Sequence, residues 1–168
     1  ADELVGGILS AGPDRLTAAA KAGIPQVVSV GALDMVNFGP RDTVPEKFKD
    51  RKFHQHNPTV TLMRTTVEEC LKLGEEIGRK VSLSETGSAR LLFPLQGVSA
   101  IDRDEQPFDD PLAREALLTG IRRGTGNGCF PCEQLPLHIN DPEFAEAAAQ
   151  ALIDLIDPPK NRGTMDDA

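Results

Sequence analysis

The alternation of strand patterns with helix patterns limits the possible folds of this chain more than any other feature of its sequence. Short runs of apolar and β-branched residues lie at residues 4–10, 25–30, 51–56, 89–95 and 133–139, and helix-forming segments separate most of them. Such alternation is typical of a mostly parallel sheet whose strands are connected by helices. We therefore expect an α/β fold with a mostly parallel, doubly wound, Rossmann-like sheet and helices on both faces.

The first predicted unit is a strand, a helix and a second, parallel strand. Residues 13–23 start with a proline, are rich in alanine and end at a glycine, which indicates a helix between the strand runs at 4–10 and 25–30. The residues between these runs are enough for the crossover that parallel strands require. Residues 43–50 predict a further, shorter helix.

The longer helices are marked by their start signals. In residues 66–81 apolar side chains recur at helical spacing, and Thr66 with Glu69 has the form of a capping box. Asp110 and Asp141 each precede a proline, which is the pattern of an N-cap followed by the first helical residue. We expect helices to begin at all three places.

Length and charge exclude several classes of protein. The chain of 168 residues predicts one domain, placed at residues 1–156, and a tail at residues 157–168 without an apolar pattern that we expect to be disordered. The formal net charge of -8 repels nucleic acid and anionic membrane surfaces, so neither is expected as a partner. The small number of cysteines and the lack of a signal-peptide pattern favour a cytoplasmic location.

The stretch "VVSVGALDMVNFGPRD" (residues 27–42) predicts that a buried strand opens at Gly31 into a polar loop. Similar transitions follow the other predicted strands, and the carboxyl ends of parallel strands gather at one edge, where open α/β sheets bind their ligands. The residues that we expect to bind a ligand there are Gly12, Arg15, Gly31, Asp34, Asn37, Asn57, Arg64, Thr65, Thr66, Gly97, Ser99 and Asn140.

Two of these loops have the composition of an anion site. Arg64, Thr65 and Thr66 precede a predicted helix, whose free N–H groups and dipole favour a phosphate. Gly12 and Arg15 form a second candidate, because glycine allows close approach of the backbone and arginine supplies a fork of donors. The alternative is that the threonines only cap the helix and that Arg64 forms a surface ion pair.

Acidic and histidine side chains at the same strand ends predict further chemistry. Asp34 and Asp102 could hold Mg²⁺ together with the oxygens of a bound phosphate. His138 is the candidate catalytic residue, as a general acid or base, because its ordinary pKa lies near neutrality. The alternative for His138 is a hydrogen bond to a backbone carbonyl.

Two further patterns suggest metal or redox chemistry more weakly. His54 and His56 point to one face of a predicted strand, but no third ligand is evident. Cys129 and Cys132 form a Cys-x-x-Cys pair in a glycine-rich loop, away from the helix N-terminus that a redox pair requires. We interpret both pairs as structural.

Several segments together resemble a known family. The quoted stretches are "SAGPDRLTAAAKAGIPQVVSVGALDMVNFGP", "HNPTVTLMRTTVEE", "PLQGVSAID" and "HINDPEFAEA". They are similar to the C-terminal half of uncharacterised bacterial proteins related to the N-terminal region of the plant tomato mosaic virus resistance protein, and the resemblance covers Val5 to about Leu155. It implies an upstream α/β half of the same protein as a partner, and ATP binding at a cleft shared with that half or with a second subunit. The start of the chain at Ala1, without a methionine, agrees with this expectation.

Two functions remain open at this stage. The first is binding of a nucleotide or other phosphorylated small molecule at the strand ends, with ATP and Mg as candidate cofactors. The second is a non-catalytic interaction or regulatory module whose polar loops form a subunit interface in a homo-oligomer. The apolar loop residues Met35, Phe38 and Met63 favour the second, because they suit the core of an interface.

Overall fold

The centre of the domain is a parallel sheet of three strands. The computed structural model describes residues 1–126, 130 and 132–158. β1 (Gln26–Val28), β5 (Ala89–Pro94) and β6 (Cys132–Leu135) pair in the order β1-β5-β6, all parallel. The predicted α/β class and the presence of a parallel sheet are therefore confirmed.

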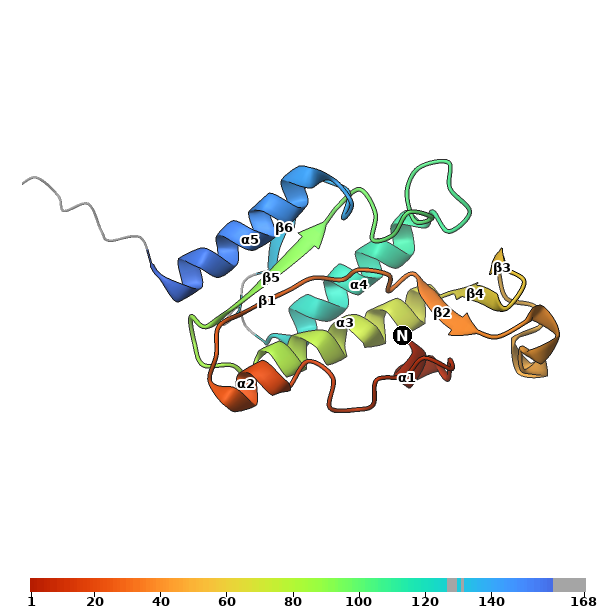
Figure 1. The fold of residues 1–168 in the computed structure, drawn as a ribbon, viewed down its shortest axis with the longest axis horizontal. Helices are drawn as coiled ribbons and strands as arrows, with labels where there is room; N and C mark the ends of the chain where they lie inside the picture. Colours follow the sequence, from red (N-terminus) through yellow and green to blue (C-terminus); the bar gives the residue numbers. More distant parts are fainter. Residues whose placement is uncertain (127–129, 131, 159–168) are drawn as a thin grey trace, which may run out of the picture.

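Helices cover both faces of this sheet. Figure 1 shows α5 (Pro142–Ile156) on one side and the pair α3 (Val67–Val81) and α4 (Pro111–Gly124) on the other. Along β5 the side chains of Leu91 and Phe93 pack into the core beneath α3 and α4, whereas Leu92 packs against α5. A strand that is buried on both faces reads as a continuous apolar run, which is why the sequence predicted it well.

The second sheet was not expected. β2 (Met35–Phe38), β4 (Val60–Arg64) and β3 (Phe53–Asn57) form an antiparallel sheet in the order β2-β4-β3. β2 and β4 lie where we predicted ligand-facing loops, so the expectation of one mostly parallel sheet was wrong for these segments. The physical reason is a period of two, since Val36 and Phe38 are buried while Met35 and Asn37 are half-buried.

The N-terminal prediction was wrong as well. Residues 4–10 form no strand; α1 (Asp2–Val5) is a single helical turn that ends at Gly6, with a φ of 104°. The helix predicted at residues 13–23 is reduced to α2 (Ala18–Ala22). Gly12 and Leu16 take positive φ angles of 82° and 72°, which a helix cannot accommodate. The predicted first strand–helix–strand unit is therefore absent.

The predicted helix starts are confirmed in position. Thr66 and Glu69 form the capping box of α3, and the Asp110 carboxylate accepts a hydrogen bond from Ala113 N at 3.0 Å. Asp141 is the N-cap of α5, but its carboxylate accepts from His138 N, at 2.7 Å, and makes no capping bond.

The remaining elements are short 3-10 turns and segments at the ends of the chain. η1 (Arg41–Thr43) precedes η2 (Glu46–Phe48), and η2 lies in the predicted short helix. The predicted disordered tail lies outside the described residues from 159 onward. In the part of the chain that the structure describes, no helix is both long and apolar enough to cross a membrane.

Four glycines set the distance between α3 and α4. Gly74 and Gly78 on α3 face Gly120 and Gly124 on α4, and a Cβ atom on any of them would come within 2.5 Å of a backbone oxygen of the other helix. For Gly120 the nearest atom would be Leu71 O, at 2.1 Å. The two backbones therefore pack in direct contact, and no side chain fits between them.

Gly120→Ala is expected to destabilise the domain by about 1–3 kcal/mol, because overpacking outweighs the gain of about 1 kcal/mol in helix propensity. The measurement is urea unfolding followed by circular dichroism. Glu115→Ala, on the exposed side of α4, is the matched control and should shift the free energy of unfolding by less than about 0.5 kcal/mol. Equal stability of the two variants would contradict the close contact.

Candidate functional site

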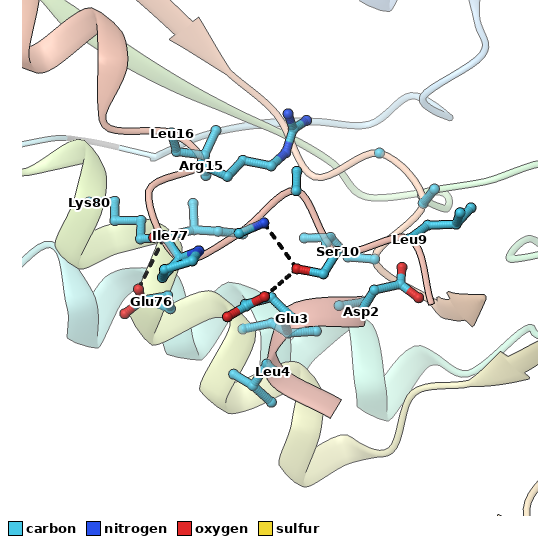
Figure 2. A pocket seen from close by; sticks show the side chains of 18 of the residues that line it. Asp2, Glu3, Leu4, Leu9, Ser10, Arg15, Leu16, Glu76, Ile77 and Lys80 are labelled. Atoms are coloured by element: carbon cyan, nitrogen blue, oxygen red, sulfur yellow. Dashed lines mark hydrogen bonds and ion pairs between the residues drawn. The ribbon is translucent and has the colours of Figure 1, made fainter. Parts of the chain in front are cut away.

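A cavity of about 530 Å³ lies between the N-terminal segment, the loop that follows β1, and α3 (Figure 2). It is lined by four residues that the sequence assigned to ligand binding, namely Gly12, Arg15, Gly31 and Asn37. Its volume falls in the range of small-molecule sites. Residues from two of the five polar loops that were predicted to follow the strands therefore meet at one cavity.

One wall of the cavity is apolar. Leu16 comes from the loop before α2, and Leu73 and Ile77 come from one face of α3 (Figure 2 labels Leu16 and Ile77). Ser29 also lines the cavity, and its Oγ is buried without a hydrogen-bond partner among the described residues. The wall thus combines a surface for an apolar group with one unused hydroxyl.

The cationic side chains around the cavity differ in how exposed they are and in whether they already have partners within the protein. Arg15 is exposed at the rim. Lys80 is buried, donates to Pro13 O at 2.6 Å and pairs with Glu76 at 3.3 Å. Arg15 is therefore better placed than Lys80 to meet an incoming anion.

The acidic groups at the cavity have partners within the protein. Asp2 accepts hydrogen bonds from Asn37 N at 2.7 Å and from Asn37 Nδ2 at 2.9 Å. Glu3 accepts from Ser10 Oγ, as Figure 2 shows. The Asp2 bonds tie α1 to β2, and the Glu3 bond ties α1 to Ser10 on the cavity wall.

The other predicted strand-end residues also converge, but in a buried network rather than in the cavity. Arg64 is 6% exposed and lies at the end of β4. Its Nε donates to Phe108 O at 2.8 Å and its Nη1 to Thr65 Oγ1 at 2.8 Å. Nη1 also lies 3.2 Å from Asp34 O. The guanidinium is therefore occupied by partners within the protein.

Asp102 is the anionic centre of this network. Its Oδ1 accepts from Arg64 Nη2 at 3.2 Å and from Arg114 Nη1 at 2.9 Å, and its Oδ2 accepts from Val98 N at 3.0 Å. Burial disfavours the charge on Arg114, but the hydrogen bonds and charges of Asp109 and Asp102 outweigh burial and raise the pKa of this guanidinium.

Asp34 lies beside this ion cluster. Its Oδ2 accepts a hydrogen bond from Ser99 Oγ at 2.7 Å, and its Oδ1 is buried without a partner among the described residues. Burial raises the pKa of Asp34 to about 6, and the negative charge of Asp102 adds to this effect. The Ser99 hydrogen bond and the charge of Arg64 act in the opposite direction and offset burial only in part.

His138 is 2% exposed and is bonded at both ring nitrogens. Nδ1 lies 3.1 Å from Asn140 N, a backbone donor, so Nδ1 accepts and Nε2 carries the proton. Nε2 then donates to Ser99 O at 2.9 Å. This is the carbonyl-bonded alternative that the sequence left open, and a catalytic role for His138 stays a prediction.

Gly97 is required by the packing of this network. Its φ is 130°, and a Cβ atom there would lie 1.8 Å from Asp102 O and 2.8 Å from His138 Cδ2. The atoms that come close to Gly97 are therefore those of Asp102 and His138 in the same protein, and not those of a ligand.

The last three predicted ligand residues have local roles. Asn57 stabilises the turn between β3 and β4 by accepting from Thr59 N at 2.9 Å. Thr66 caps α3. Asn140 is exposed, and its N–H bonds to His138. None of the three lines the cavity, so the prediction that they meet the other ligand-binding residues there is not met.

The weaker metal and redox patterns gain no support. Among the described residues no group of three or more His, Cys, Asp or Glu side chains could hold a metal ion. Burial raises the pKa of Cys132 to about 11, which disfavours the reactive thiolate, and Cys129 lies outside the described residues. His54 packs edge-on against Phe108. Magnesium at Asp34 and Asp102 stays a prediction.

Sequence reasoning missed some residues of both sites. Lys80 could have been found, because it falls on the same helical face as Leu73 and Ile77, where a cation is unexpected. Arg114 carries no signal in the sequence that separates it from the other arginines of α4. Its role depends on its distance from Asp102 in space.

The fold and the cavity define an α/β domain in which a parallel sheet is joined to a small antiparallel sheet through buried ions. The sequence profile described as "Uncharacterised protein family (UPF0261) C-terminal domain" matches residues 1–156. The chain therefore belongs to this family, and the resemblance stated from the sequence is confirmed.

Curated relatives include bacterial and plant proteins. A UPF0261 protein of Clostridium tetani is 48% identical over 156 residues, which are 93% of this chain and 38% of that relative. A UPF0261 protein of Rhizobium meliloti is 49% identical over 161 residues, which are 94% of this chain and 39% of that relative. The ToMV resistance protein Tm-1 of Solanum lycopersicum is 42% identical over 164 residues, 96% of this chain and 21% of its own length. The chain thus spans well under half the length of each of these relatives.

Arg64→Lys is expected to lower the free energy of unfolding by about 2 kcal/mol or more, because lysine keeps the charge but cannot reproduce the fork of buried hydrogen bonds. Urea unfolding measures the change. Arg79→Lys, at an exposed ion pair on α3, is the control and should leave the stability unchanged. A loss no larger than in the control would show that the buried network contributes little.

Proposed function

We propose that this domain binds a nucleotide or another phosphorylated small molecule in the cavity between the N-terminal segment and the loop after β1. The observation that carries the proposal is the meeting of Gly12, Arg15, Gly31 and Asn37 around one cavity of about 530 Å³. These residues come from separate segments and were assigned to ligand binding from the sequence.

The chemistry of the cavity suits such a ligand. We assign the phosphate to Arg15 rather than to Arg64, because the Arg15 guanidinium is exposed at the rim whereas that of Arg64 is bonded within the protein. The space next to Gly12 is free of other atoms for 4 Å around a notional Cβ, so a phosphate can come close there, beside the Ser10 hydroxyl that accepts from Gly12 N at 3.0 Å. The apolar wall at Leu73 and Ile77 suits a base or another flat group.

The family relationship suggests ATP with Mg as the first ligand to test. The short coverage of the relatives supports a proposal for the whole protein, in which an upstream half or a second subunit completes the cleft and the parallel sheet belongs to a doubly wound, Rossmann-like unit. We propose a cytoplasmic homo-oligomer as its form. Catalysis by His138 would require one of its two ring-nitrogen bonds to open.

A subunit interface is the second candidate function, and of the three apolar residues that favoured it in the sequence only Met35, which is half-buried, still supports it. Phe38 and Met63 are buried in the core of the antiparallel sheet with Val36 and Phe48, so they cannot form an interface. Ile8 and Leu9, in contrast, are 62% and 65% exposed near the cavity. An exposed apolar pair next to a cavity suits contact with another protein surface.

Arg15→Ala is expected to weaken binding of ATP by about tenfold, because a hydrogen bond to a charged group contributes about 1.5–3 kcal/mol. Isothermal titration calorimetry of the folded domain, with Mg and with EDTA, measures the affinity. Arg103→Ala removes the same charge at an exposed position outside the cavity and is the matched control.

Equal affinity of the two variants would remove Arg15 from the site. No binding of ATP, ADP or AMP by the folded domain or by the whole protein would reject the ligand proposal. If Leu9→Ser then converted an oligomer to a monomer in sedimentation, the interface function would be favoured.

A further inference from the structure

The loop at residues 11–17 forms the part of the cavity wall that carries Gly12 and Arg15. Inside the loop, Arg15 N donates to Gly12 O at 3.3 Å, and Thr17 N donates to Asp14 O at 3.1 Å. Both bonds close local turns, so they shape the loop but do not attach it to the rest of the domain. The position of Arg15 over the cavity therefore depends on contacts between the loop and other elements.

Two such contacts attach the loop to the face of α3 that lines the cavity. Lys80, one residue before the end of α3, donates from Nζ to Pro13 O at 2.6 Å. The side chain of Leu16 packs against the apolar core to which Leu73 and Ile77 of α3 belong. Pro13 and Leu16 flank Arg15 in the chain, and Figure 2 shows the side chains of Lys80 and Leu16 at the same cavity.

The backbone of the loop is strained between these two contacts. Leu16 has a φ of 72°, in the left-handed region that residues other than glycine rarely adopt. Such a conformation persists only where the surrounding structure holds it. If the contact at Pro13 is lost, Leu16 is expected to relax and Arg15 to leave its place at the cavity rim.

The surroundings of Lys80 suit a permanent anchor. The residue is only 7% exposed, and Glu76, one turn earlier on α3, lies 3.3 Å from its Nζ and balances its charge. Glu76 also pairs with Arg79 at 2.8 Å and has a side chain that is 41% exposed. Removal of the ammonium group in Lys80→Met would therefore leave Glu76 with a partner and with water, so the variant is expected to fold.

We propose that Lys80 is a positioning residue of the cavity, which holds the loop at residues 11–17 against α3 so that Gly12 and Arg15 are in place before a ligand arrives. Lys80 acts through the loop rather than by contact with the ligand. The inference rests on the proposed function, because it takes Arg15 as the residue that meets the phosphate.

Amide hydrogen exchange of the whole protein without ligand tests the anchor itself. The amides of Arg15 and Thr17 should exchange about tenfold faster in Lys80→Met, because the variant loses a hydrogen bond from a charged donor. Lys72→Met removes the same charge at an exposed position on α3 and is the matched control, with no expected change at these amides.

Titration calorimetry with ATP and Mg tests the effect on binding in the wild type, Lys80→Met, Arg15→Ala and the double variant. Each single variant should weaken ATP by about tenfold. The double variant should also be weaker by about tenfold, and not by the roughly hundredfold expected of independent residues, because Arg15 contributes only when its loop is held. A general loss of stability in Lys80→Met would not remove the contribution of Arg15, so this coupling separates positioning from a merely structural role.

Unchanged exchange at Arg15 and Thr17 in Lys80→Met would overturn the proposal. A full additional loss of affinity on adding Arg15→Ala to Lys80→Met would overturn it as well, and would leave the proposed function intact. If none of the four proteins bound ATP while the exchange response was present, the proposed function would be rejected, and with it the role of Lys80 in ligand binding.

Discussion

The buried guanidinium of Arg64 joins the two halves of this domain. Arg64 belongs to the antiparallel sheet, yet its donors reach the carbonyl of Asp34, the carbonyl of Phe108 and the carboxylate of Asp102, which follow β1 and β5 of the parallel sheet. A charge in the interior is tolerated only with such a full set of partners. The relative position of the two sheets is therefore fixed by polar contacts, while their separate apolar cores stabilise each sheet on its own.

Because of this connection, the polar residues at the strand ends have a structural role that the sequence did not predict. Polar residues that follow the parallel strands β1, β5 and β6 do come together, as expected, at Asp34, Ser99 and His138, and Arg64 joins this network from β4 of the antiparallel sheet. Because these side chains are buried, they hold the two sheets in position and do not face a ligand. The cavity lies on the other side of the loop after β1, where a charged rim residue and an apolar helix face remain accessible. Asp34 belongs to this buried network and also directly follows the residues that line the cavity, Gly31, Ala32 and Leu33.

The elements that the sequence predicted well are those with a local cause. The capping box of α3, the Asp110 start of α4 and the apolar run of β5 depend on side chains within a few positions of each other. The strand predicted at residues 51–56 is β3, but β2 and β4 were missed because they are short and flanked by polar residues, with Gly39 directly after β2, a composition that also suits loops. The segment at residues 4–10 was misassigned because its apolar residues suggest a strand, whereas its two glycines allow the turn that ends α1.

The sequence by itself determined the α/β class, the parallel strand at β5, the starts of the long helices and membership of the UPF0261 C-terminal domain family. Only the tertiary structure decided which polar residues are buried and which face a cavity. The physical reason is that the state of a charge depends on the atoms that surround it. Arg15 and Arg64 have the same chemistry in the sequence, but one side chain is exposed to water and the other is enclosed by oxygens brought from distant segments.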